Sequence, residues 1–259
     1  MEVVLVHGVG IGADGFATVA RCLAADGASS TVPARRGYDG RPPCPDLAVH
    51  VRDLLTHVTA DTDVIAGVSG GATIALATAV TLARVATAAG DRADDSTEVS
   101  FVVHEPLVGP LAAAQHRVVT ASIARLHDRA GSGAADEMAA VADFVAGLVG
   151  DDTFGGLSAD VRDRALAAAP TIGHETRGFA RFELEHGDLA AAAPTVTWTV
   201  GADSPPWRHE AAAVAASAGI RVETVPGGHS PHLDHPGAWA AVVRSASCRP
   251  ATERPVSTS

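Results

Sequence analysis

Lysine is absent from this 259-residue chain, so every basic side chain other than histidine is an arginine. A chain without lysine cannot form a lysine Schiff base or supply the phosphate-binding lysine of a P-loop. Acidic residues outnumber basic ones and give a formal net charge of −11, with no visible basic face for nucleic acid. We therefore expect neither a nucleic-acid partner nor lysine-dependent catalysis.

Cysteine and aromatic residues are also scarce. Cys22, Cys44 and Cys248 are odd in number and widely spaced, so they predict neither a disulfide framework nor a zinc site. Aromatics make up only 4% of the chain, so the core must consist mostly of Ala, Val and Leu. The first apolar run, Val3–Val6, is too short to span a bilayer, and no basic segment or cleavage site precedes it. These features predict a cytoplasmic protein without a membrane partner.

Short apolar runs alternate with helical patterns in two parts of the chain. The runs expected to be strands are Val3–Val6, Ser30–Pro33, Asp63–Ala66, Val99–Val103, Val196–Val200 and Ile220–Val225. The expected helices are Gly15–Asp26, one N-capped by Asp46, Ala72–Ala89, Trp207–Ala218 and Gly237–Ser245. This alternation predicts an α/β fold, with a mostly parallel sheet and helices on both faces.

The region between the two α/β parts has a different texture. Residues 107–190 contain no strand-like run and show helical periodicity, which indicates an inserted helical cap. We expect a core formed by residues 1–106 and 191–246. Residues 247–259 are polar and contain proline, so we expect a disordered tail there.

The most informative motif is Gly67–Gly71, with the sequence Gly-Val-Ser-Gly-Gly. It lies between an expected strand and an expected helix and matches G-x-S-x-G, the nucleophile elbow. The serine of such an elbow has strained backbone geometry, so the residues two positions away must be nearly free of side chain. Gly67 and Gly71 meet that requirement. The motif therefore predicts Ser69 as a nucleophile.

A nucleophilic serine needs a base and a group that orients the base. In the order typical of this strand-turn-helix arrangement, an acid and then a histidine follow the serine. Asp203 and His229 each come directly after an expected strand, at the same sheet edge as Ser69. They are our predicted acid and base. Glu105 is the alternative acid, because it ends the preceding strand at the same edge.

Other side chains compete for these roles or are expected nearby. His232 and His235 follow His229, but His229 comes first after the strand and follows two glycines that let the loop bend. We expect His7 to brace the loop after the first strand. His104, beside Glu105, is expected to be structural or to line the pocket.

These motifs resemble those of the α/β-hydrolase superfamily, in particular its esterase and hydroxynitrile-lyase-like branch. The resemblance rests on Val4–Gly8, the elbow, Gly201–Asp203 and Gly228–Pro236, and it covers about residues 1–106 and 195–245. It implies an oxyanion hole formed by two backbone N–H groups, those of Val9 and Gly70.

One further motif points to another class of protein. Gly8–Ala13 also reads as G-x-G-x-x-A between a strand and a helix, the dinucleotide fingerprint. That interpretation needs an acid about 20 residues later, but the sequence there is Thr31–Arg36, which contains no acid. Its arginines could accommodate the 2′-phosphate of NADP. It also leaves Ser69 and His229 unexplained, so an NADP-dependent oxidoreductase is a remote alternative.

The sequence thus predicts a serine hydrolase that cleaves an ester, lactone or thioester of a small hydrophobic molecule through a Ser69 acyl-enzyme, with no cofactor and no metal. The same fold also serves non-hydrolytic lyases, cyclases and C–C bond hydrolases, so that class stays open. A catalytically silent scaffold is disfavoured by the intact order of serine, acid and histidine. Oligomeric state is not encoded in any pattern of this sequence.

Overall fold

The structure is a computed structural model that describes residues 1–89, 99–108, 121, 124, 139, 143, 159–179 and 181–247. Most of residues 109–158, which belong to the expected cap, and nearly all of the expected tail lie outside these residues. The expected domain boundaries therefore remain predictions. The described residues form one parallel sheet with its flanking helices and the last part of the expected cap.

The sheet has six parallel strands in the order β2-β1-β3-β4-β5-β6. The strands are β1 (Glu2–Val6), β2 (Ser29–Thr31), β3 (Thr62–Val68), β4 (Ser100–His104), β5 (Val196–Gly201) and β6 (Arg221–Val225). Because all strands run the same way, the loops that follow them gather at one edge, where α/β proteins place their reactive groups.

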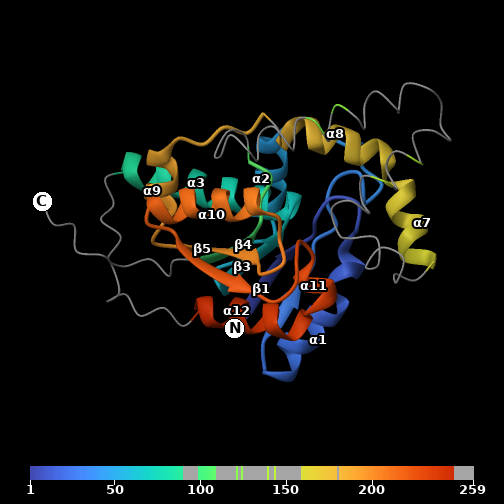
Figure 1. The fold of residues 1–259 in the computed structure, drawn as a ribbon, viewed down its shortest axis with the longest axis horizontal. Coiled ribbons are helices and arrows are strands. Elements are labelled where there is room, and N and C mark those ends of the chain that lie inside the picture. Colours follow the sequence, from blue (N-terminus) through green and yellow to red (C-terminus); the bar gives the residue numbers. More distant parts are fainter. Residues whose placement is uncertain are drawn as a thin grey trace, which may run out of the picture.

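Helices cover both faces of the sheet (Figure 1). They are η1 (Ala13–Phe16), α1 (Ala17–Ala25), α2 (Leu47–Leu55), α3 (Gly70–Ala89), α7 (Ala159–Ala167), α8 (Ala169–Phe179), α9 (His186–Ala192), α10 (Pro206–Ser217), α11 (Pro231–Asp234) and α12 (Pro236–Ser247). Helices α1 and α12 lie on one face, and α2, α3, α9 and α10 on the other. This is the predicted α/β architecture.

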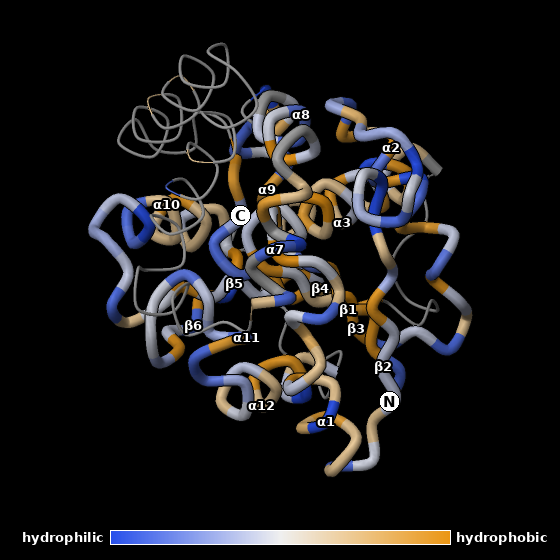
Figure 2. The backbone as a smooth tube through the Cα atoms, turned by 90° about the vertical axis from the view of Figure 1, so that its right-hand side faces the viewer, coloured by the Kyte–Doolittle hydropathy of each residue, from blue (hydrophilic) through white to orange (hydrophobic). Residues whose placement is uncertain are grey.

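Alternating strand residues build two apolar cores, one on each face of the sheet. Val4, Val6 and Ile65 pack toward α3 and α10, whereas Val3 and Leu5 pack toward α1 and α12. Both faces of the central strands are buried, so β1, β3 and β4 run as hydrophobic segments through the middle of the fold (Figure 2). Buried on both sides, these strands hold the loops at the carboxyl edge in fixed positions.

Local sequence signals account for several element boundaries. Asp46 caps α2, as expected, and its carboxylate accepts a hydrogen bond of 2.9 Å from the Ala48 amide. The expected helix after the first strand begins as the 3₁₀ turn η1 and continues as α1. The short helix α11 was not expected from the sequence.

Among the described residues, one helix, α3, is long and apolar enough by length and composition to cross a bilayer. Its most apolar window is 56% buried inside the protein, where it packs against β3 and β4. The core helix of a globular domain has the same character, so this helix is weak evidence for a membrane span.

Candidate active site

Ser69 stands on a sharp turn between β3 and α3, with a left-handed φ of 53°. The turn brings the two ends of the motif into close backbone contact. A Cβ on Gly67 would lie 2.6 Å from the carbonyl of Gly71, and one on Gly71 would lie 2.1 Å from the Val6 carbonyl oxygen. Only glycine fits these positions without moving the backbone. The structure therefore shows the strained, glycine-dependent turn that the motif predicts.

His229 lies in the loop after β6 and is buried. Its Nδ1 is 2.7 Å from Oε2 of Glu105, whose carboxylate is ionised, so Nδ1 donates the proton. This hydrogen bond fixes the neutral imidazole as the tautomer with its proton on Nδ1. Nε2 is then left as a proton acceptor.

Glu105 is the central acid of the site, and its carboxylate contacts donors on three residues besides His229. The Gly201 amide donates to Oε1 at 2.9 Å, the Ser204 hydroxyl also donates to Oε1, and Arg208 Nε lies 2.9 Å from Oε2. Burial alone would raise the pKa of this carboxyl, but the guanidinium of Arg208 and the hydrogen bond from His229 hold the pKa well below its usual value. Glu105 therefore stays ionised at neutral pH.

Asp203 does not occupy the position expected of it. Its side chain is exposed on the loop after β5, where its amide donates 2.9 Å to the Gly227 carbonyl. The geometry instead places Glu105, the alternative acid, against His229. The loop that carries Asp203 supports this acid through Ser204, one residue further along. Neither Ser204 nor Arg208 was singled out in the sequence, because a serine and an arginine beside a helix start carry no local signal of such a contact.

Ser69 Oγ and His229 Nε2 are both buried and hydrogen bond no other described residue. A buried polar atom without a partner costs free energy, and such atoms concentrate where a reaction needs them. Both side chains adjoin the loop after β4, since the Ser69 amide donates 2.9 Å to the carbonyl of His104, and the next residue, Glu105, bonds His229. Burial and the charge on Arg208 lower the pKa of His229, which keeps the imidazole neutral.

The two residues whose amides are expected to form the oxyanion hole lie close together. Gly70 is the first residue of α3, so its N–H has no partner within the helix. A Cβ on Gly70 would lie 2.5 Å from Cγ2 of Val9 and 2.6 Å from the ring of Phe179, which places all three residues together. Gly8, next to Val9, would place a Cβ 3.5 Å from Cβ of Ser69. The structure thus brings Val9 and Gly70 together near Ser69.

His104 and His7 are both fully buried, and the ring nitrogens of each contact polar protein atoms. His104 contacts the Thr199 hydroxyl through Nδ1 at 3.0 Å and the Gly228 carbonyl through Nε2 at 3.2 Å. Burial lowers the pKa of His104 to about 3. His7 Nδ1 lies 3.0 Å from the Gly8 carbonyl oxygen, in line with its expected role in bracing that loop.

His104, Glu105 and His229 also bring three potential metal-ligating atoms within 4.8 Å of one another. Both nitrogens of His104 face protein partners, and both oxygens of Glu105 accept from protein donors, one of them the cationic Arg208. An ion placed there would compete with a guanidinium already paired to the carboxylate. The arrangement suits a hydrogen-bonded acid and base better than a metal centre.

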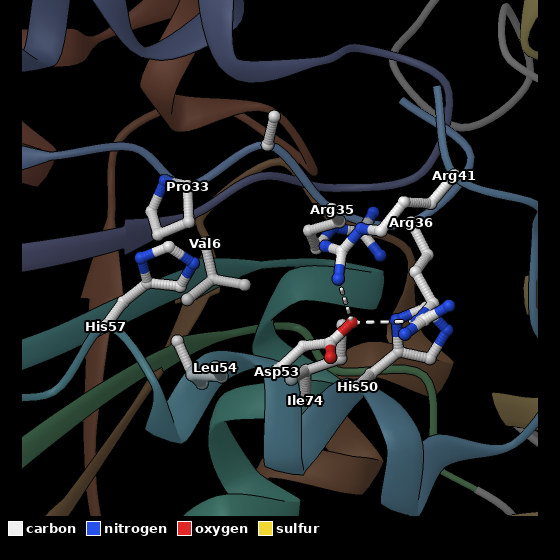
Figure 3. A pocket seen from close by; sticks show the side chains of 11 residues that line it. Val6, Pro33, Arg35, Arg36, Arg41, His50, Asp53, Leu54, His57 and Ile74 are labelled. Atoms are coloured by element: carbon white, nitrogen blue, oxygen red, sulfur yellow. Dashed lines mark hydrogen bonds and ion pairs between the residues drawn. The ribbon is translucent and has the colours of Figure 1, made fainter. Parts of the chain in front are cut away.

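A separate small cavity of about 20 Å³ lies between the loop after β2 and helix α2 (Figure 3). Arg36 and Arg41 meet Asp53 there, at 2.9 and 3.1 Å. A cavity of this size holds about one water molecule. It is too small for an organic substrate and lies apart from Ser69.

Comparison with known proteins supports the superfamily that the motifs resemble. A model of the alpha/beta hydrolase family matches residues 3–242. This chain belongs to the alpha/beta hydrolase family. Among curated proteins, none matches its sequence significantly.

Solved structures similar to this α/β hydrolase include an esterase, an enol-lactonase and a bromoperoxidase. A thermophilic esterase from Thermogutta terrifontis is 18% identical with a TM-score of 0.67, over 95% of this chain and 88% of that one. An enol-lactonase from Burkholderia xenovorans LB400 is 15% identical with a TM-score of 0.64, over 95% and 90%. A bromoperoxidase from Bacillus anthracis is 15% identical with a TM-score of 0.68, over 95% and 91%. At these identities the likeness shows the fold alone.

The contacts of the glycine-rich loop after β1 do not favour a dinucleotide site. Gly8 packs against Ser69, as described above. Arg35, which could have served a 2′-phosphate, is buried, and both of its terminal nitrogens bond Glu175 or the Gly8 carbonyl. The family match and these contacts together argue against the oxidoreductase alternative.

Proposed function

We propose that this chain is a serine hydrolase that cleaves an ester, lactone or thioester of a small hydrophobic molecule through a Ser69 acyl-enzyme. One observation carries the proposal. Ser69 Oγ and His229 Nε2 are buried and have no hydrogen-bond partner among the described residues, while His229 Nδ1 is fixed by an ionised Glu105. A nucleophile, a base and an orienting acid are the three parts that such chemistry requires.

In the proposed first half-reaction, Ser69 Oγ attacks the acyl carbon and its proton passes to His229 Nε2. The carbonyl oxygen becomes an oxyanion, which accepts hydrogen bonds from the amides of Val9 and Gly70. Glu105 stabilises the imidazolium that forms. His229 then returns the proton to the leaving alcohol or thiol as the acyl–oxygen or acyl–sulfur bond breaks, which leaves Ser69 acylated.

The second half-reaction repeats these steps with water. His229 Nε2 takes a proton from water while the water oxygen attacks the acyl carbon. The tetrahedral intermediate collapses, the bond to Ser69 Oγ breaks, and His229 returns the proton to that oxygen. The acid is released and the enzyme is restored without a cofactor.

The hydrophobic character of the substrate is supported by the residues around the nucleophile. Val9 and Phe179 are buried against Gly70, and Leu107 and Val108 are buried just after Glu105. No cationic side chain among the described residues is left free beside Ser69, since Arg35 and Arg208 are both paired with carboxylates. A neutral acyl group suits these surroundings better than an anionic one.

The test is covalent labelling of Ser69 with a fluorophosphonate, together with turnover of p-nitrophenyl acetate. We expect labelling at Ser69, and loss of both labelling and turnover in Ser69→Ala. Ser204→Ala is not a suitable control, because Ser204 contacts Glu105. Ser217→Ala, on the exposed end of α10, serves instead and is expected to keep both signals. Folded protein that is not labelled at Ser69 would contradict the proposal.

A further inference from the structure

Arg35 and Glu175 form a buried ion pair that joins two distant parts of the chain. Arg35 follows β2 and is 7% exposed, and Glu175 lies on α8 with no exposure. Nη1 of Arg35 donates to Oε1 of Glu175, and Nη2 lies 3.3 Å from Oε2. Burying two charges costs free energy, so such a pair is weak evidence for stability and invites another explanation.

The same guanidinium reaches the loop of the proposed oxyanion hole. Nη2 of Arg35 donates 2.8 Å to the carbonyl oxygen of Gly8. This carbonyl and the N–H of Val9 belong to one peptide unit, which is planar and trans, so the two groups point in opposite directions. A guanidinium that holds the Gly8 oxygen therefore also sets the direction of the Val9 N–H.

A second contact fixes the next peptide of this loop. The Gly10 amide donates 2.8 Å to the hydroxyl of Tyr38, and this hydroxyl donates to Oε2 of Glu175 at 3.3 Å. Gly10 has a φ of 84°, a conformation that glycine adopts readily. The peptide units on both sides of Val9 are therefore tied, through Arg35 and Tyr38, to one carboxylate on α8.

We propose that Arg35 is a positioning residue that aims and polarises the Val9 N–H of the oxyanion hole, and that Glu175 makes this arrangement depend on the docking of α8. The proposal rests on the function proposed above. A cation on the carbonyl oxygen draws electron density across the peptide and makes its N–H a stronger donor, since hydrogen-bonded groups in a low-dielectric interior polarise one another. Arg35 lies behind the peptide and acts on the reaction only through it.

The proposal also gives a role to the described end of the expected cap. Helix α8 packs on the core through Phe179, whose ring lies beside Gly70 and Val9. Glu175 lies four residues earlier, on the same side of the helix. One helix thus contacts both proposed oxyanion donors by packing and orients one of them through Arg35. The proposed oxyanion hole therefore includes packing and orienting contacts from α8.

The test compares Arg35→Gln with Arg36→Gln, using p-nitrophenyl acetate and the inhibitor trifluoroacetophenone. Ser69 Oγ adds to the carbonyl carbon of this ketone, the serine proton moves to His229, and the carbonyl oxygen becomes an oxyanion. The affinity of the enzyme for this inhibitor therefore reports on the oxyanion hole. Arg36 is a matched control, since its guanidinium pairs with Asp53 on α2 (Figure 3). We expect Arg35→Gln to lower kcat and inhibitor affinity together by roughly 10- to 100-fold, with KM nearly unchanged, because a misaimed donor loses part of the effect of a deleted one. Arg36→Gln should leave all three values unchanged.

Glu175→Gln provides a second variant, which keeps the shape of the side chain but removes its charge and one of its two acceptor oxygens. It should lower kcat and inhibitor affinity in the same direction by a smaller factor. If both variants fold and neither changes kcat or inhibitor affinity, while Ser69→Ala is inactive, Arg35 has only a structural role and this inference fails alone. If Ser69→Ala keeps full turnover, the proposed function itself fails.

Discussion

Ser69 and Glu105 adopt the same left-handed backbone conformation, with φ of 53° and 47°, each directly after the end of its strand. Their strands are neighbours, and Val68 pairs with His104 in the register of β3 and β4. The two strained residues are therefore side by side at the carboxyl edge of the sheet. They are the only non-glycine residues of positive φ in the described part of the chain. Strain of this kind clusters at functional sites, where the surrounding structure enforces it.

The contact between Glu105 and His229 predicts which carboxylate supports catalysis. Glu105→Gln keeps the side-chain shape but cannot stabilise the imidazolium, so we expect kcat for p-nitrophenyl acetate to fall on the order of 10³- to 10⁴-fold. Asp203→Asn, on the exposed loop, should change kcat by less than about twofold, as surface substitutions generally do. Steady-state kinetics of the two purified variants measures both effects.

A folding control is needed, because Glu105→Gln also leaves Arg208 buried without its counterion. Removing one member of a buried pair costs about 3–5 kcal/mol. Far-UV circular dichroism at the assay temperature separates loss of folding from loss of catalysis. A large loss of activity in Asp203→Asn, with Glu105→Gln active, would return the acid role to Asp203.

The pH dependence of turnover should report His229 as the base. Burial and Arg208 lower the pKa of this imidazole below 6.5, whereas Glu105 raises it. The deprotonated base is therefore present at a lower pH than for a free histidine, and kcat/KM at pH 6.5 should exceed half of its plateau value. In Glu105→Gln the raising contribution is lost, so the residual activity should have its acid limb at a still lower pH. An acid limb above pH 6.5 in the unmodified protein would contradict this assignment of the base.

The sequence was sufficient for the sheet and for the turn at Ser69, because each rests on a local signal. Buried parallel strands read as apolar runs, and the turn at Ser69 needs glycines at fixed offsets. The choice between Asp203 and Glu105 was different in kind. Both residues follow a strand at the same edge, and which one reaches His229 depends on backbone direction at that turn. The left-handed φ of Glu105 is a tertiary property with no signature in the string His104–Pro106.

The buried pair of Arg35 and Glu175 was equally beyond the sequence. The two residues lie 140 positions apart, and each is surrounded by residues typical of a loop or a surface helix. Charged residues are seldom fully buried, so no pattern in a single sequence singles them out. Their partnership depends on where α8 docks, which only the folded chain decides.

Buried histidines should make the protein sensitive to acid. Burial lowers the pKa of both His104 and His232 to about 3. Their unfolded pKa is near 6.5, so below pH 6.5 the unfolded chain binds protons that the folded chain excludes, and stability falls as pH falls. Each such group contributes about 1.4 kcal/mol per pH unit between those values. The depressed pKa of Glu105 acts in the same direction below about pH 4.5, and the raised pKa of Glu175 opposes it.

His232→Phe isolates one of these contributions. The His232 ring stacks on Phe16 with centroids 4.9 Å apart, and a phenyl ring can keep that contact. Urea denaturation at pH 6.0 and 5.0 should show a smaller loss of unfolding free energy in the variant, by about 1.4 kcal/mol. An equal loss in both proteins would mean that His232 takes up a proton in the folded state as readily as in the unfolded chain.

The elbow glycines predict the sign of an otherwise small substitution. A Cβ on Gly71 would lie 2.1 Å from the Val6 carbonyl oxygen and 2.5 Å from that of His7, so the backbone itself must move. We expect Gly71→Ala to destabilise the protein by about 1–3 kcal/mol or more, as overpacking does, and to reduce turnover because the His7–Gly8 loop shifts. Gly187→Ala makes the same chemical change in α9, where a Cβ meets nothing within 4 Å. Alanine is the better helix former, so that variant should be as stable as the unmodified protein or up to about 1 kcal/mol more stable. Urea midpoints followed by circular dichroism measure both, and equal midpoints for the two variants would show that the turn at Ser69 tolerates a side chain that the geometry excludes.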